Sequence, residues 1–111
     1  MEKKKYEKIT KEDVLNILVK CAVDELKSGH GLMNVINIAS LLKTSKYQVR
    51  KYTKELRNEG LIKLICEFFY SDEELYPPYW GYVLTEKGMK TDLFAKEKAK
   101  WEKWFAEWIQ S

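Results

Sequence analysis

The chain has 111 residues, of which 45% are apolar and 33% are charged, and its formal net charge is +3. This length suits a single domain, and the composition is that of a folded protein rather than a disordered one. We expect no membrane span and no membrane partner, because no stretch approaches the roughly 20 uncharged apolar residues that a span requires. Cys21 and Cys66 lie in apolar runs without a C-x-x-C unit. We therefore expect buried free thiols in a cytoplasmic protein, with a disulfide as the less favoured alternative.

The first predicted element is a helix that begins at Thr10 and ends at Ser28. Asp13 stands three residues after Thr10, which is the spacing of a capping box. The apolar residues that follow at helical spacing are Leu15, Leu18 and Ala22. The helix stops at a glycine-flanked turn that holds His30, which we interpret as a loop residue rather than a ligand or a base.

A short strand over residues 32–35 and a second helix over residues 38–43 are predicted next. Asn37 directly precedes the apolar run and is expected to cap this helix. Three side chains are expected to face the core: Ile38, Leu41 and Leu42.

The third predicted helix, residues 45–59, has the clearest start in the chain. Ser45 and Gln48 form an S-x-x-Q capping box, and Gly60 supplies the residue that favours a left-handed terminus. The pattern then changes period: residues 61–69 and 79–84 are rich in aromatic and β-branched residues and predict two strands. The polar, proline-broken residues 71–78 between them predict a hairpin loop. A final helix is predicted from Thr85 to the end of the chain.

These elements resemble the helix-turn-helix of bacterial winged-helix regulators. The matching segments are Ile38-Ala39-Ser40-Leu41-Leu42, Ser45-x-x-x-Val49 and Leu56-x-x-x-Gly60-Leu61-Ile62, and Gly81-Tyr82-x-Leu84-Thr85-x-x-Gly88 is similar to their exit from the wing. The resemblance covers residues 34–88. It implies an α+β, mainly α, winged helix-turn-helix fold, with a DNA-binding domain over residues 1–88 and a long C-terminal amphipathic helix over residues 89–111. It also implies a bacterial or phage transcriptional regulator with no cofactor.

The third predicted helix has a basic face. When each residue is advanced by about 100° around the axis, Val49, Tyr52, Thr53 and Leu56 fall on one side, which is the expected core face. The opposite arc of about 140° holds Lys46, Tyr47, Arg50, Lys51, Lys54 and Arg57, whereas Glu55 and Glu59 lie outside it. Residues 43–63 carry seven cations and two anions. The basic charge of the chain is thus concentrated on this helix and its flanks.

This placement suits the phosphate-lined major groove of double-stranded DNA. Ser45 and the helix N-terminus are expected to hold a phosphate. We assign base readout to Tyr47, Gln48, Arg50 and Lys51, although the cap also engages Gln48, and backbone contacts to Lys46, Lys54 and Arg57. The alternative is that this charged face binds no partner and is only solvated. The absence of carboxylates in the arc disfavours this alternative, because a solvated helix usually mixes charges of both signs.

Two features suit protein partners. The hairpin tip carries Asp72, Glu73 and Glu74, which DNA would repel. Tyr76, Tyr79 and Trp80 beside the tip fit a partner surface or the core, and we favour the core for Trp80. The last predicted helix gathers apolar residues on one face, and those predicted to form a homodimer interface are Leu93, Trp101, Trp104, Phe105 and Trp108. The alternatives are packing against the first helix of the same chain and a membrane-interface helix.

No nucleophile elbow, phosphate loop or Cys/His cluster with metal-ligand spacing occurs in the sequence, so we expect neither an enzyme nor a metal site. The leading hypothesis is a homodimeric DNA-binding regulator. The alternative is a winged-helix module for protein–protein assembly that uses the acidic hairpin and the tryptophan-rich helix.

Overall fold

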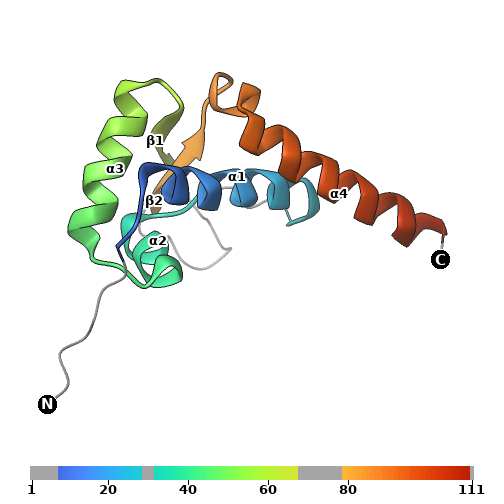
Figure 1. Ribbon diagram of the computed structural model, residues 1–111, viewed down its shortest axis with the longest axis horizontal. Coiled ribbons are helices and arrows are strands. Elements are labelled where there is room, and N and C mark those ends of the chain that lie inside the picture. Colours follow the sequence, from blue (N-terminus) through green and yellow to red (C-terminus); the bar gives the residue numbers. More distant parts are fainter. Residues whose placement is uncertain (1–7, 29–31, 68–78, 111) are drawn as a thin grey trace, which may run out of the picture.

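The computed structural model describes residues 8–28, 32–67 and 79–110. It is mainly helical, with one two-stranded antiparallel sheet (Figure 1). The elements in chain order are α1 (Lys11–Ser28), α2 (Val35–Leu42), α3 (Lys46–Asn58), β1 (Ile62–Glu67), β2 (Tyr79–Leu84), a 3-10 turn (Gly88–Lys90) and α4 (Asp92–Gln110). The predictions for His30 and for the loop over residues 71–78 lie outside the described residues.

The core is built around α1, whose inward side chains are fully buried. Val14, Leu18 and Val19 have no solvent exposure, and Ile38 of α2 is buried against the same cluster. On α3, the predicted core face is confirmed: Val49, Thr53 and Leu56 are buried and Tyr52 is half-buried. The predicted N-terminal capping box is also confirmed, since Asp13 N donates to Thr10 Oγ1 at 3.2 Å and Thr10 N donates to Asp13 Oδ2 at 2.9 Å.

The hairpin strands pair with Ile62 opposite Leu84 and Glu67 opposite Tyr79. The predicted bounds of the second strand are confirmed, and the described part of the first begins at Ile62. On its other edge β2 is bridged by Met33, because Tyr82 N donates to Met33 O at 2.7 Å and Met33 N donates to Tyr82 O at 3.1 Å. The predicted strand over residues 32–35 is therefore reduced to a single bridge.

Helix α2 begins earlier than the sequence suggested. Asn34, not Asn37, is its cap: Asn37 N donates to Asn34 Oδ1 at 2.8 Å. The cause is the bridge at Met33, which ends the extended segment and leaves Asn34 as the first residue free to cap. The inward placement of Leu41 was wrong, since this side chain is 59% exposed. The buried face of α2 is centred on Ile38 and Ala39, and Leu42 packs at its edge.

The final helix begins later than predicted, at Asp92. Thr85 does not start a helix; its hydroxyl donates to Gly60 O at 2.5 Å and accepts from Gly88 N at 3.1 Å. This tertiary contact holds the 3-10 turn against the end of α3. Thr91 provides the cap of α4 instead, because its hydroxyl accepts a hydrogen bond from Phe94 N at 3.3 Å.

Neither cysteine forms a disulfide, and each side chain is only partly buried, whereas full burial was expected. Cys21 lies on α1 and Cys66 on β1. In the described part of the chain, no helix combines the length and apolar character that a bilayer crossing requires.

Candidate nucleic-acid interface

A tight turn between α2 and α3 sets the start of the basic helix. Lys43 closes α2 in the left-handed conformation, with φ 53° and ψ 45°, and its N–H donates to carbonyls of the preceding turn. Ser45 then caps α3, since its hydroxyl accepts from Gln48 N at 3.2 Å. A lysine in this conformation has no sequence signal, because glycine and asparagine are the usual residues there.

The C-terminal end of α3 is fixed by several contacts. Gly60 has φ +77°, as its predicted role requires, and its N–H donates to Arg57 O at 2.9 Å. Lys87 Nζ, from beyond the hairpin, donates to Glu59 O at 2.8 Å. Sequence reasoning missed Lys87, because the contact joins residues 28 positions apart and leaves no local pattern. A cation at this end also suits the helix dipole.

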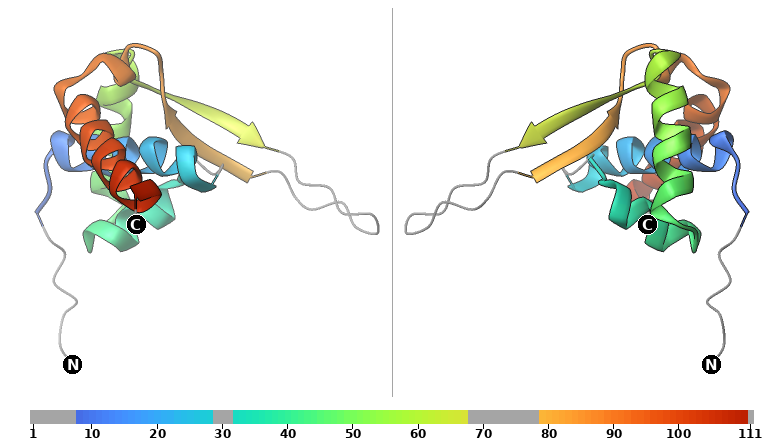
Figure 2. Two further views of the ribbon diagram at one scale, coloured as in Figure 1. Left: turned by 90° about the vertical axis from the view of Figure 1, so that its right-hand side faces the viewer. Right: turned by 90° about the vertical axis from the view of Figure 1, so that its left-hand side faces the viewer.

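The outer face of α3 is solvent-exposed along its whole length. Figure 2 shows α3 on the outside of the molecule, with the side opposite the core uncovered. The exposed side chains of the predicted arc are Lys46, Tyr47, Arg50, Lys51, Lys54 and Arg57. Among the described residues, none of these five cations forms an ion pair. The basic face therefore keeps its full charge available to an anionic partner.

The carboxylate that directly follows α3 contacts α1. Glu59 Oε1 accepts a hydrogen bond from Lys11 Nζ of α1 at 2.6 Å. This hydrogen bond, aided by the charges of Glu59 and Glu55, raises the pKa of Lys11 above its usual value of 10.5, although partial desolvation opposes the shift. The Glu59 carboxylate is thus paired with α1 and not with a cation of the basic face.

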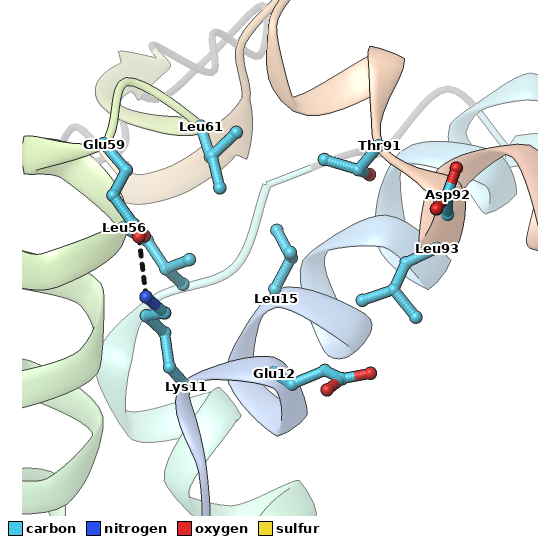
Figure 3. Close-up of a pocket in the computed structure, with 9 residues that line it drawn as sticks. All are labelled: Lys11, Glu12, Leu15, Leu56, Glu59, Leu61, Thr91, Asp92 and Leu93. Carbon is cyan, nitrogen blue, oxygen red and sulfur yellow. Dashed lines mark hydrogen bonds and ion pairs between the residues drawn. The ribbon is translucent and has the colours of Figure 1, made fainter.

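A surface pocket of about 280 Å³ lies beside this ion pair, between α1, the end of α3 and the start of α4 (Figure 3). Its apolar lining consists of Leu15, Leu56, Leu61 and Leu93, and its polar lining consists of Lys11, Glu12, Glu59, Thr91 and Asp92. Three carboxylates and one ammonium group border an apolar floor. The charge of this rim is therefore opposite in sign to that of the outer face of α3.

The structure divides the eight residues predicted to bind DNA into two groups. Six are exposed on the outer face, as described above. Ser45 and Gln48 are half-buried at the start of the helix. Gln48 Oε1 accepts a hydrogen bond from Ile9 N at 3.4 Å, which ties the segment before α1 to α3. Gln48 is thus engaged within the fold, whereas the side chains of Tyr47 and Arg50 are exposed, and Lys51 is exposed with its Nζ 5.4 Å from the centroid of the Tyr52 ring.

The two strands of the hairpin extend away from the helices (Figure 2). Our placement of Trp80 in the core was wrong, since it is 55% exposed. It shares a strand face with Tyr82 and Leu84, but it lies closer to the hairpin tip, past the part of the sheet that packs on the core. Tyr79 is half-buried, and its hydroxyl accepts from Asn37 Nδ2 at 2.9 Å. The acidic residues 72–74 and Tyr76 lie outside the described residues.

The residues predicted to form a dimer interface are spread along α4. Leu93 and Phe94 pack on the core of their own chain, as the intrachain alternative expects. Trp101 is half-buried, whereas Trp104, Phe105 and Trp108 are exposed. The apolar face of the helix is therefore partly covered by its own chain in the first half and exposed in the second half.

Among the described residues, no group of three or more His, Cys, Asp or Glu side chains is placed to hold a metal ion. Comparison with protein-family models, curated proteins and solved structures gave no significant match to this chain.

Proposed function

We propose that this protein is a DNA-binding domain of the winged-helix type, from a transcriptional regulator, that places α3 in the major groove of double-stranded DNA. The observation that carries the proposal is the outer face of α3, which holds five exposed cations and no carboxylate. Over 13 residues this helix is about 20 Å long, and its width fits a major groove about 12 Å wide.

The architecture gives further support. The order of α1, a bridge at Met33, α2, α3 and a β-hairpin suits a winged helix, in which two helices joined by a tight turn precede the wing. The inner face of α3 is fixed to the core, so its outer side chains project from a rigid base. Arg50 and Lys51 near its N-terminal half suit base readout, whereas Lys54 and Arg57 suit phosphate contacts.

Salt dependence provides the test. If five cations each neutralise a phosphate, a plot of the logarithm of the association constant against the logarithm of the salt concentration has a slope of about −4.5. The affinity then falls about 500-fold between about 50 and 200 mM salt. An Arg50→Ala, Lys54→Ala variant removes two of these phosphate contacts, so its slope should be about −2.7. Its affinity should fall only about 40-fold over the same range of salt concentration. Fluorescence anisotropy of labelled random duplex DNA measures both.

The matched control is Lys96→Ala, Lys103→Ala on α4, which removes the same charge from exposed positions of another element. Its slope should equal that of the wild type. Equal slopes for all three proteins, or no binding of the wild type to DNA at low salt, would contradict the proposal that the outer face of α3 binds DNA.

The exposed aromatic residues favour a second candidate function, a protein–protein assembly module. Trp80 on β2, toward the tip of the hairpin, and the last turns of α4 supply surfaces that such a module would use. This candidate is favoured if the wild type does not bind DNA at low salt but binds another protein through Trp80 or the last turns of α4.

A further inference from the structure

The second half of α4 carries an apolar face that its own chain does not cover. Figure 1 shows the last turns of α4 extending past the end of α1. The uncovered side chains are Trp104, Phe105, Trp108 and Ile109, which are 46%, 39%, 62% and 59% exposed. At roughly 200 Å² for each large side chain, these fractions amount to about 400 Å² of apolar surface. That is about half of what one partner contributes to a standard interface, roughly 800 Å².

The aromatic rings on this face stack on one another. Trp101 stacks on Phe105 with centroids 5.2 Å apart, Phe105 on Trp108 at 6.1 Å, and Trp104 on Trp108 at 6.4 Å. Trp101 lies where the covered half ends, and its buried Nε1 has no hydrogen-bond partner within the described chain. A continuous aromatic layer thus begins at the edge of the folded core and runs to the end of the helix.

The charges that border this layer are self-complementary. Lys100 and Glu107 lie seven residues apart, which is nearly two full turns, so both lie on the same flank of the apolar face. In an antiparallel helix pair related by a two-fold axis, each flank of the apolar face lies beside the same flank of the partner helix. An axis at Trp104 brings Lys100 level with Glu107 of the partner chain, within one residue or about 1.5 Å of rise. The same axis brings Trp101 level with Trp108 of the partner chain, again within one residue.

We propose that the occupant of this face is a second copy of the chain, in an antiparallel α4–α4 pair centred on Trp104, with two reciprocal Lys100–Glu107 contacts. The inference goes beyond DNA binding and does not depend on it. A closed two-fold pair buries the aromatic layer of both copies against each other, and it leaves each α3 outside the interface.

Charge reversal tests both the partner and the register. Lys100→Glu creates two carboxylate–carboxylate contacts in the symmetric pair, and Glu107→Lys creates two ammonium–ammonium contacts. Lys100→Glu also removes the ion pair between Lys100 Nζ and Glu97 Oε1 of the same chain, which are 3.6 Å apart, so recovery in the mixture of the two variants is the decisive result. Each variant alone should therefore self-associate about tenfold more weakly than the wild type in sedimentation velocity without DNA. An equimolar mixture of the two variants should recover association, because the mixed pair restores two opposite-charge contacts. Lys103→Glu, on the back of α4, is the matched control and should leave association unchanged.

Trp108→Ala gives an independent readout. This side chain is largely exposed in the single chain, so its removal should leave the far-UV circular dichroism unchanged while weakening self-association. A wild type that stays monomeric at all concentrations overturns the proposal. So does failure of the mixed charge variants to recover association, or binding of the wild type to anionic lipid vesicles without self-association. None of these measurements uses DNA, so their failure is distinguishable from failure of the DNA-binding proposal.

Discussion

Replacement of Gly88 by alanine should destabilise the fold through a steric clash with the backbone of Leu61, between α3 and β1. A Cβ at Gly88 would lie 2.2 Å from Leu61 O and 3.0 Å from Leu84 Cδ2. The carbonyl has little room to move, because it accepts the hydrogen bond from Thr85 N at 3.0 Å. Overpacking of this kind costs about 1–3 kcal/mol, and loss of the hydrogen bond adds about 1 kcal/mol. We expect the free energy of unfolding to fall by about 3 kcal/mol.

Gly60→Ala is the informative comparison. Its backbone is left-handed, but a Cβ there would meet only Lys87 side-chain atoms, at 3.7 and 4.0 Å. The substitution therefore carries the conformational penalty alone, about 1 kcal/mol. Urea denaturation followed by circular dichroism measures both variants. If Gly88→Ala costs no more than Gly60→Ala, the close approach of Gly88 to Leu61 is refuted.

Two further predictions concern the ends of α3. Ser45→Ala removes the acceptor for Gln48 N and should lower the free energy of unfolding by about 1 kcal/mol, whereas an unchanged urea midpoint would show that the cap is dispensable. The contact with Glu59 raises the pKa of Lys11 above 10.5, so it stabilises the fold below that pH and is lost as the pH rises through the folded-state pKa. The stability difference between the wild type and Glu59→Gln should therefore shrink at strongly alkaline pH; a difference that is constant with pH would argue against the pair.

Local signals predicted α3 well. The serine cap, the glycine terminus and the four-residue core face are all set by neighbours within a few positions, and each is found in the structure. The second strand was also predicted with its observed bounds, because its aromatic and β-branched run directly follows Pro77 and Pro78.

The elements that the sequence predicted at the wrong positions depend on contacts between segments that are distant in the chain. The cap of α2 moved to Asn34 because Met33 pairs with β2, nearly fifty residues later in the chain. Thr85 has the sequence character of a helix start, but its hydroxyl is used by Gly60 O. Trp80 was assigned to the core because aromatic residues of a hairpin usually pack on it, but the sequence does not show where the hairpin leaves the core. For the candidate site, the exposed basic face followed from helical periodicity, whereas the Lys11–Glu59 pair joins two helices and had no sequence signal.

The opposite charges on the two sides of α3 have a consequence for the approach to a partner. Five cations lie on the outer side, while Glu59, Glu12 and Asp92 gather around the pocket on the side of α1. The described charges around α3 therefore form an electric dipole, although Lys11 offsets one of the three carboxylates. In the field of a polyanion this dipole exerts a torque that turns the basic side forward before contact, so more of the diffusional collisions begin in a productive orientation.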